Sequence, residues 1–393
     1  MPSAGPRSSL LALNSGSSSL KFGLYQVESS IPKVLLSGEA EAIGGDEGRF
    51  WVKDASGNTQ VTEAESVKTQ HDAVARIRRL FADREEIQPA AIGHRVVHGG
   101  PYLRSHCLID DSVLRQIESA VAFAPLHNPP ALSVIRFASE HFAGLPQVAC
   151  FDTGFHTGMP DVARTLPIPL KLRSEGIRRY GFHGLSCESI LRQLGADRPD
   201  RIIIAHLGNG ASVTAIKDGQ SIDTSMGLTP AGGVIMGTRS GDLDPGILVY
   251  LARERNFDAA HLEVLVDRNS GLLGISGIDS DMRGLHEAST TNAAARLAIQ
   301  MFCYSIRKQI AAMIAALDGV DLLIFTGGIG EHDAKVRLAI CSGLSWLGIS
   351  LDPTRNQSLR DPISDPTSRC VVRVLPSEED AQIAVRTCEL AGC

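Results

Sequence analysis

The sequence predicts an α/β protein built from two related halves. Short apolar runs that suit buried strands alternate along the chain with segments of helical periodicity, and this alternation is typical of α/β architecture. Two similar segments, LLALNSGSSSLKFGLY at 10–25 and RIIIAHLGNGASVTAIKDG at 201–219, each place an Asn/Gly/Ser turn between two apolar strands. This repetition indicates that both halves share one plan. The Asp-Gly pair that ends the second segment predicts a further hairpin.

The predicted strands are short apolar runs bounded by turn residues. In chain order they are Leu10–Leu13, Leu20–Val27, Ala91–Val97, Gln147–Phe151, Ile202–Ala205, Leu322–Phe325 and Val371–Leu375. A helix is predicted over Asp72–Ala82, because Val74, Ile77 and Phe81 recur at helical spacing. A longer helix is predicted over Asn292–Leu317, and its apolar character indicates burial. A Pro- and Gly-rich stretch at 154–170 marks a domain boundary.

Composition excludes several classes of protein. With 393 residues, 43% of them apolar and 21% charged, the chain has enough material for two domains. The net charge of −6 and pI of about 6.1 argue against a nucleic-acid or membrane-surface binder, which needs clustered Lys and Arg. The eight cysteines form no C-x-x-C pair and are interpreted as reduced thiols. No stretch suits a signal peptide or a membrane span, so a cytoplasmic location is expected.

The first turn, between Asn14 and Lys21, admits two interpretations. Gly, Ser and Asn are the residues that any hairpin turn prefers. A turn without bulky side chains, lined with N–H and O–H donors and ending in Lys21, also suits a phosphate group. The chain contains no Gly-Lys dipeptide and hence no Walker A loop, so a nucleotide would be bound by other parts. His94 and His98 fall in and after a predicted strand, where their spacing does not suit a shared metal ion.

Several polar clusters set Arg, His, Asp, Asn or Glu beside Gly at the ends of predicted elements. They are HRVVHGG (94–100), APLHNP (124–129), CFDTGFH (150–156), RRYGFHG (178–184), AHLGNG (205–210), MGTRSGDLDPG (236–246), SDMRG (280–284), FTGGIGE (325–331) and SEED (377–380). Each alone is compatible with a structural role. Together they supply cations for phosphoryl oxygens, oxygen ligands for Mg²⁺ and small residues for close backbone approach, which phosphoryl transfer needs.

These ordered motifs resemble those of the acetate and propionate kinases over nearly the whole chain. The resemblance implies two duplicated ribonuclease-H-like domains of the sugar kinase, actin and heat-shock chaperone superfamily, with a cleft between them. The implied domains are residues 1–153 with 381–393, and residues 154–380. The implied reaction is reversible, in-line phosphoryl transfer from ATP to acetate. Alternatives are a propionate or, more distantly, a butyrate kinase, a pyrophosphate-dependent phosphotransferase, and a non-catalytic nucleotide-binding sensor.

The resemblance also implies roles for individual residues. The catalytic positions are Asp152, His183, Arg239, Arg95 and His127, with the two arginines holding the acyl carboxylate and the migrating phosphoryl group. An apolar pocket for the acyl methyl group is formed by Val97, Leu126, Phe182 and Pro230. ATP or ADP is contacted by Lys21, His206, Leu207, Gly208, Asn209, Gly210, Asp281, Met282, Arg283, Gly327, Gly328, Ile329, Gly330 and Glu331. The residues for Mg²⁺, or alternatively Mn²⁺, are Asn14 and Glu379, with Glu378 as the alternative to Glu379.

Chemistry and departures from the family pattern refine these expectations. Asp152 is expected to orient an arginine or a metal-bound water rather than to act as a base. The substrate of this family is a carboxylic acid whose pKa is near that of Glu, about 4.3, so it is already ionised at pH 7 and needs no base. Gly154 stands where the family usually has Ala, and GLSCES at 184–189 replaces the more usual Thr and His. These departures concern fine specificity. Since the family is dimeric and the helix over 292–317 is apolar, a homodimer is expected.

Overall fold

The computed structural model describes residues 9–393 apart from 17, 29, 47, 64–65 and 83–86. Ser17 of the first turn therefore lies outside the described residues. The chain forms two compact units: the first contains the chain up to Phe155, Gly184–Ser189 and Glu378–Cys393, and the second contains His156–His183 and Ile190–Ser377. The domain boundaries at 153 and 380 stay a prediction.

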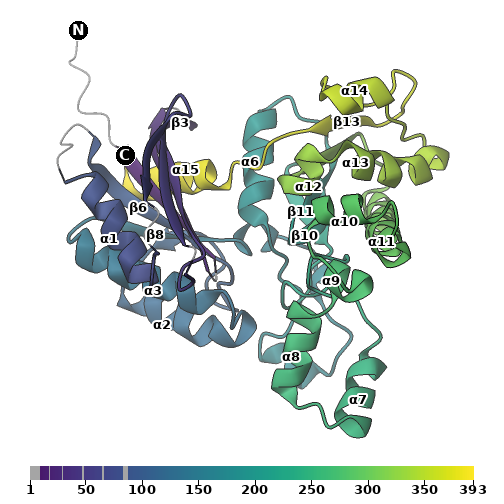
Figure 1. Ribbon diagram of the computed structural model, residues 1–393, viewed down its shortest axis with the longest axis horizontal. Coiled ribbons are helices and arrows are strands. Elements are labelled where there is room, and N and C mark those ends of the chain that lie inside the picture. The colour runs from purple at the N-terminus through teal and green to yellow at the C-terminus, as the bar shows by residue number, and fades with distance from the viewer. Residues whose placement is uncertain (1–8, 17, 29, 47, 64–65, 83–86) are drawn as a thin grey trace. The chain divides into compact units, whose positions relative to one another are not determined.

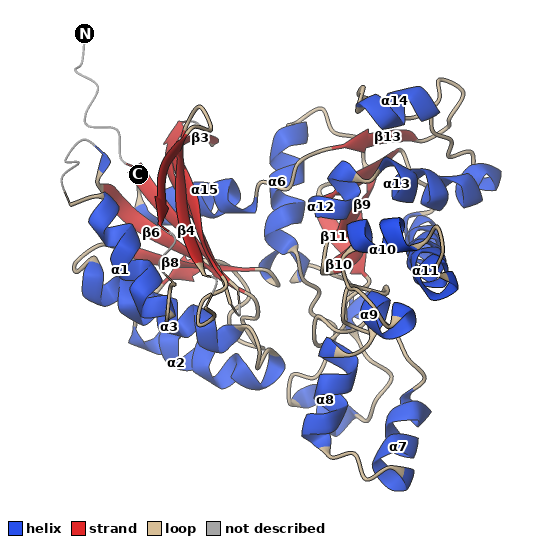
Figure 2. Ribbon diagram, in the orientation of Figure 1, coloured by secondary structure: helices blue, strands red, loops and turns tan. Residues whose placement is uncertain are grey.

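Among the described residues, the first unit is built around an eight-stranded mixed sheet (Figure 2). Its strands are β1 Ser9–Ser15, β2 Leu20–Glu28, β3 Ile31–Glu41, β4 Arg49–Asp54, β5 Thr59–Glu63, β6 Pro89–Val96, β7 Cys107–Leu108 and β8 Gln147–Phe151. Their order across the sheet is β5-β4-β3-β2-β1-β6-β8-β7. β1 pairs antiparallel with β2 and parallel with β6, and β8 extends the parallel part.

Helices cover both faces of this sheet (Figure 1). They are α1 Gln70–Leu80, α2 Asp111–Ser119, the short η2 Ala120–Phe123, α3 Asn128–His141 and α15 Glu379–Ala391. Leu11 and Leu13 of β1 belong to an apolar core with α1 and α3, whereas Leu10 and Ala12 belong to a core with α15. Because successive strand residues point to opposite faces, β1 is buried on both sides, which explains its continuous apolar sequence.

The second unit contains a five-stranded sheet in the order β11-β10-β9-β12-β13. The strands are β9 Arg201–Leu207, β10 Ala211–Lys217, β11 Gln220–Thr224, β12 Leu322–Thr326 and β13 Val371–Val374. β9 pairs antiparallel with β10 and parallel with β12, as β1 does with β2 and β6. The predicted Asp218-Gly219 hairpin is confirmed: it joins β10 to β11 with φ of 52° and 79°, the positive values that a type I′ turn requires.

The remaining helices follow β8 along the chain. They are η3 Gly154–His156, α4 Asp161–Arg164, α5 Leu170–Ser174, α6 Gly184–Leu194, α7 Pro245–Glu254, α8 Ala259–Arg268, α9 Gly271–Ser276, α10 Met282–Ala288, α11 Ala293–Leu317, α12 Gly327–His332, α13 Ala334–Cys341, η4 Ser342–Leu347 and α14 Pro353–Ser358. α11 packs along β10 and β9. Within the described part of the chain, no helix has the length and apolar character needed to cross a membrane.

Every strand predicted from an apolar run is present, with ends that differ by a few residues at most. The two predicted helices are confirmed as α1 and α11. β3, β4 and β5 were not predicted, because they lie toward one edge of the sheet and carry many polar, partly exposed side chains. Their apolar content is too low to stand out from a loop.

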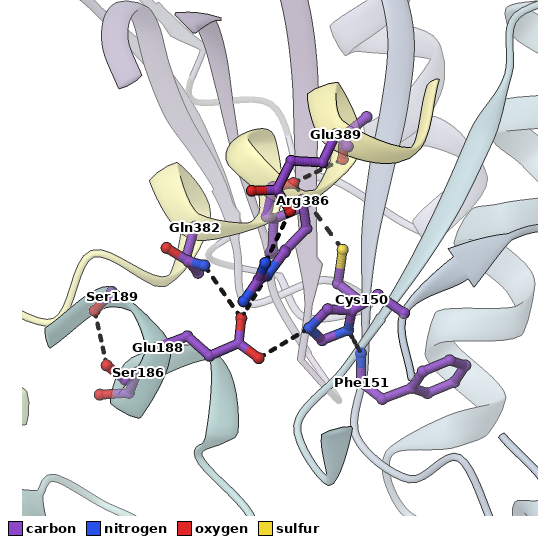
Figure 3. A network of polar contacts seen from close by, with 11 residues as sticks. Cys150, Phe151, Ser186, Glu188, Ser189, Gln382, Arg386 and Glu389 are labelled. Atoms are coloured by element: carbon purple, nitrogen blue, oxygen red, sulfur yellow. Dashed lines mark hydrogen bonds and ion pairs between the residues drawn. The ribbon is translucent and has the colours of Figure 1, made fainter. Parts of the chain in front are cut away.

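A buried polar network joins three segments of the first unit, and Figure 3 shows Glu188 of α6 close to Gln382 and Arg386 of α15. Glu188 Oε1 accepts a hydrogen bond from His106 Nε2 at 3.0 Å. Its Oε2 accepts from Arg386 Nε at 2.8 Å and from Gln382 Nε2 at 3.1 Å. Burial alone would raise the pKa of Glu188, but the interactions with His106 and Arg386 outweigh it and lower the pKa to about 2.

We predict that Glu188→Gln makes stability less dependent on acid. Because the pKa of Glu188 in the folded protein lies below its ordinary value of 4.5, the stabilisation is complete above that value and is lost as the pH falls toward 2. Between pH 6 and pH 4 the free energy of unfolding of the unmodified protein should therefore fall by about 1 kcal/mol more than that of the variant. Urea unfolding at both pH values measures this difference.

The control for this measurement is Glu389→Gln. Glu389 pairs with the same Arg386 but is exposed, so its loss should leave the acid dependence close to that of the unmodified protein. Equal acid dependence of Glu188→Gln and the unmodified protein would show that the Glu188 carboxylate does not contribute as described.

Candidate active site

A row of polar side chains crosses the first sheet at the carboxyl end of β1. The strand register pairs Asn14 with Lys21 on β2, and Lys21 with Glu39 on β3. α15 begins at this row with Glu379 and Asp380. Glu39 and Asp380 were not predicted as site residues: Asp380 lies within the SEED motif, but Glu39 is brought here only by the pairing of β3 with β2.

Arg95, near the carboxyl end of β6, lies in the middle of this cluster. Its Nε and Nη2 donate to Asp152 Oδ2 at 2.9 and 2.6 Å, and its Nη1 donates to Asn14 Oδ1 at 3.3 Å. Burial alone would lower the pKa of Arg95, but the charges of Asp152 and Glu379 outweigh it and raise the pKa. Arg95 is therefore permanently charged. These bonds use three of the five N–H groups of its guanidinium.

Asn14 connects Arg95 to the start of α15. Its Nδ2 donates to Asp380 Oδ1 at 2.9 Å, so its Oδ1 faces Arg95. Burial raises the pKa of Asp380 and also that of Glu39, which lies close enough to feel the charge of Asp380. Several carboxyl groups are gathered beside Asn14, and their neighbours and their burial disfavour the charged form. A hard cation would stabilise that charged form.

The carboxylates of this cluster fit a Mg²⁺ ion whose coordination is shared with a ligand. The described residues contain no group of three or more His, Cys, Asp or Glu side chains placed to hold a metal ion by themselves. Mg²⁺ characteristically binds one or two protein carboxylates together with substrate phosphates and water, so a complete protein cage is not required. The half-buried Asp380 and the neighbouring Glu379 carry oxygen donors of the kind that such a site needs.

Asn128 joins the segment that contains Val97 to the segment that contains Leu126. The side chain of Asn128 accepts the His98 backbone N–H at 3.2 Å and donates to the His98 carbonyl at 2.9 Å. This fixes the segment after β6 to the start of α3, whose N-cap residue is His127. Val97 is buried and Leu126 is partly buried. Asn128 therefore ties the loop that carries Val97 to the turn that carries Leu126.

In the second unit, His183 and Arg239 converge on Gly210 in the turn between β9 and β10. A Cβ atom on Gly210 would lie 3.3 Å from His183 Nε2 and 3.5 Å from Arg239 Nη1. His183 has a left-handed backbone with φ of 57°, and its Nδ1 bonds Ser212 Oγ at 2.9 Å. Its ring stacks on His206 with centroids 4.1 Å apart. A side chain at position 210 would occupy the space where these two polar groups meet.

Close backbone contacts hold the segment that carries Arg239. At the start of α9, Leu272 donates its N–H to the Met236 carbonyl at 2.8 Å. Gly271 has a φ of 62°, and a Cβ atom there would lie 2.7 Å from the Arg239 carbonyl oxygen. Arg239 Nη1 donates to the carbonyl oxygen of Pro230 at 3.0 Å. These contacts direct the guanidinium toward the β9–β10 turn.

A cavity of about 1030 Å³ opens beside this turn. Many predicted nucleotide residues line it: Gly208, Asn209, Asp281, Met282, Arg283, Gly328, Ile329 and Glu331. The predicted His206 and Leu207 lie in β9, Gly327 and Gly330 lie in α12, and Gly210 faces His183 and Arg239. The cavity also includes residues that were not predicted, among them His286, Asp333, Lys335 and Arg337. Its size suits a nucleotide.

Glu331 and Arg337 hold the two ends of α12. Glu331 Oε1 accepts the backbone N–H groups of Gly327 and Ser377, both at 2.9 Å, so this carboxylate caps the start of the helix. The buried Arg337 donates through Nη1 to the carbonyl oxygens of Gly330 and Glu331 at 2.8 and 2.9 Å. The sequence could not reveal Arg337, because its partners, which are backbone carbonyl oxygens and the Asn356 side chain, are brought close only by the fold.

The predicted residues thus fall into two groups. Asn14, Lys21, Arg95, Val97, Leu126, His127, Asp152 and Glu379 belong to the first unit. The predicted nucleotide residues other than Lys21, together with Phe182, His183, Pro230 and Arg239, belong to the second. The four residues predicted around the acyl methyl group are therefore divided between the units.

Comparison with known proteins matches residues 9–385 to the model of the Acetokinase family. An acetate kinase of Campylobacter lari is 40% identical, covering 97% of this chain and 98% of its own length. One from Methylocella silvestris is 41% identical, covering 97% of each. Among solved structures, a propionate kinase from Francisella tularensis is 37% identical with a TM-score of 0.90, covering 98% of this chain and 100% of its own. Porphyromonas gingivalis acetate kinase is 36% identical with a TM-score of 0.86, covering 98% and 99%.

Proposed function

Because the chain belongs to the acetokinase family, we propose that it transfers the γ-phosphoryl group of ATP to the carboxylate of acetate, giving acetyl phosphate and ADP. The observation that carries this proposal is the convergence of His183 and Arg239 on Gly210, beside a cavity of nucleotide size. An imidazole and a guanidinium aimed at one backbone turn supply the hydrogen bonds and positive charge that a migrating phosphoryl group requires.

In this mechanism an acetate oxygen attacks the γ-phosphorus in line with the bond to the β–γ bridging oxygen of ATP. That bond breaks, the electron pair leaves with ADP, and no proton has to move. Arg239 and His183 stabilise the charge that develops on the transferred oxygens. Arg95 holds the acetate carboxylate. Asp152 accepts two hydrogen bonds from Arg95 on one oxygen, which supports an orienting role rather than that of a base.

Mg²⁺, or Mn²⁺ in its place, would be held by Glu379 and Asp380 together with phosphate oxygens of the nucleotide. The ion neutralises charge on the phosphates when bound. Asn14 donates to Asp380 and accepts from Arg95, so its main contribution is to fix these two groups relative to each other. Glu378 donates its backbone N–H to Ser189 Oγ and stays the alternative to Glu379.

Substitution of Arg239 tests the catalytic proposal directly. Arg239→Ala should lower kcat by about 10²- to 10³-fold, the scale observed when one preorganised donor to the transition state is lost. The assay contains acetate, Mg-ATP and hydroxylamine, which traps acetyl phosphate as a hydroxamate. Arg198→Ala removes a partly exposed arginine of the same unit, whose Nη1 donates to the Gly195 carbonyl, and should leave kcat unchanged. A change confined to KM in Arg239→Ala would contradict the role given to this residue.

Propionate is the second candidate substrate, because the chain is similar to a solved propionate kinase over almost its whole length. The two acids differ by one methylene, which a small apolar pocket discriminates by about 1–3 kcal/mol. Val97 and Leu126, held together through Asn128, are proposed to contact the acyl methyl group from the first unit. We propose acetate as the preferred acid, by roughly 10- to 200-fold over propionate.

Val97→Ala should raise kcat/KM for propionate relative to acetate, because it enlarges the pocket by the volume of two methyl groups. The KM for ATP should change little. Val134→Ala, the same substitution in a core residue of α3, controls for general loss of packing. Values of kcat/KM for acetate, propionate and butyrate are compared under one set of conditions. An unchanged ratio of kcat/KM for propionate to that for acetate would show that Val97 does not line the pocket. A preference of the unmodified protein for propionate would show that acetate is not the preferred acid.

We also propose that the protein is a homodimer formed through the second unit. α11 buries one side in the core but exposes Leu297, Met301 and Tyr304, which are 49%, 37% and 58% accessible. Trp346 of η4 is 75% accessible. Large exposed apolar side chains of this kind are typical of surfaces that a second copy covers.

Light scattering in solution should therefore report a mass close to twice 41.9 kDa. Tyr304→Asp should shift the equilibrium toward the monomer, because it places a charge in the apolar surface. Tyr102→Asp is the matched control, since Tyr102 is similarly exposed but belongs to the first unit. A monomer of the unmodified protein at micromolar concentration would contradict the proposal.

A further inference from the structure

We propose that Glu188 and His106 are positioning residues for Asp152, and that through Asp152 they set the direction of the Arg95 guanidinium. The inference rests on the proposed function and names two residues that the family resemblance did not. Both belong to the first unit, where their side chains are 8% and 11% accessible. They act on the reaction through the backbone that carries Asp152.

His106 holds the end of β8. Its Nδ1 accepts the backbone N–H of Phe151 at 3.0 Å, so the ring proton lies on Nε2, which donates to Glu188. Phe151 directly precedes Asp152, whose own N–H donates to the Val96 carbonyl at 3.0 Å. The two peptide groups that precede Asp152 are therefore fixed, one by the imidazole and the next by the neighbouring strand.

Glu188 fixes the other side of Asp152 through its own helix. Gly184, the first residue of α6, donates its N–H to the Asp152 carbonyl at 2.9 Å. A Cβ atom on Gly184 would lie 2.3 Å from that same oxygen, so the helix approaches as closely as a backbone allows. α6 and the end of β8 are thus joined twice, once through backbone and once through the His106–Glu188 pair.

Two residues in the middle of α6 also anchor α15. Glu188 Oε2 accepts from Arg386, and the next residue, Ser189, accepts the backbone N–H of Glu378 through Oγ at 3.3 Å. Glu378 immediately precedes α15, whose first turn contains the Asp380 that bonds Asn14. Glu188 therefore links the segment that carries Asp152 to the segment that carries Asp380, and Arg95 interacts with the charge of both.

Gly154 lies beside the His106 ring. A Cβ atom at position 154 would lie 3.1 Å from His106 Cε1, closer than an ordinary contact. The missing side chain therefore leaves room for the ring that pairs with Glu188. Gly154 and Glu188 thus act on the same imidazole.

The test compares Glu188→Gln with Glu389→Gln, which removes the exposed carboxylate that pairs with the same Arg386. Glu188→Gln should lower kcat by about 10- to 100-fold, the effect typical of losing a group that orients a catalytic residue. The KM for ATP should stay unchanged, because the proposed nucleotide residues lie mainly in the second unit. Glu389→Gln should keep full activity, and Glu188→Asp, which retains the charge, should recover part of kcat. Thermal unfolding of each variant shows that the folded protein is being assayed.

Gly154→Ala tests the same arrangement without leaving a buried charge unpaired. It should lower kcat in the unmodified background by displacing His106, and should have no further effect in a His106→Ala background, so that the two substitutions are not additive. Full additivity would contradict the proposed contact.

The outcomes distinguish the proposed function from the positioning role of Glu188 and His106. If the unmodified protein forms no acetyl phosphate, the proposed function is wrong, and so is the positioning role that rests on it. If the unmodified protein is active and folded Glu188→Gln has the same kcat, only the positioning role is overturned. A variant whose loss of activity merely equals its unfolded fraction would also overturn that role.

Discussion

The arrangement of the first unit depends on a largely buried guanidinium. Arg95 is largely removed from water at the end of β6, and an unpaired charge in such a place destabilises a protein by about 3–5 kcal/mol. Its partners come from the ends of three other elements: Asn14 from β1, Asp152 from just after β8, and Glu379 from α15. The charge of Arg95 therefore fixes where these elements end relative to one another. The same requirement concentrates carboxylates at the start of α15, and this concentration favours a cation.

The two sheets share one topology but carry different polar side chains. β3-β2-β1-β6-β8 and β11-β10-β9-β12-β13 share one order, with the first pairings antiparallel and the later ones parallel. In both sheets the turn after the first strand is rich in small residues. The first turn is followed by Lys21, with Asn14 on β1 and Arg95 on the neighbouring β6. The second leaves Gly210 open to His183 and Arg239. The same topology thus carries a charged cluster in the first unit and, in the second, a glycine turn that faces His183 and Arg239.

The sequence predicted the strands of both sheet centres because they are buried on both faces and hence continuously apolar. It predicted Arg95, His183 and Arg239 as site residues through motifs, although their roles stay proposals. It could not predict Glu39, which reaches the site only through the register of β3 against β2. It also could not predict the pairing of His106 with Glu188, which lie 82 residues apart and belong to no common motif. Contacts of this kind depend on tertiary structure, and the local sequence contains no signal for them.

The direction of Arg95 is sensitive to the placement of a single oxygen atom. Asp152 Oδ2 accepts from both Nε and Nη2, so a small shift of the Asp152 backbone rotates the whole guanidinium. That backbone is held by three bonds from three different sources: the Val96 carbonyl, the Gly184 N–H and, one residue earlier, the His106 ring. The first two are backbone contacts that most sequences can form. The third exists here because Gly154 makes room for the ring and Glu188 fixes its proton on Nε2. Side chains that do not contact the proposed substrates therefore help to determine how the site presents its carboxylate-binding arginine.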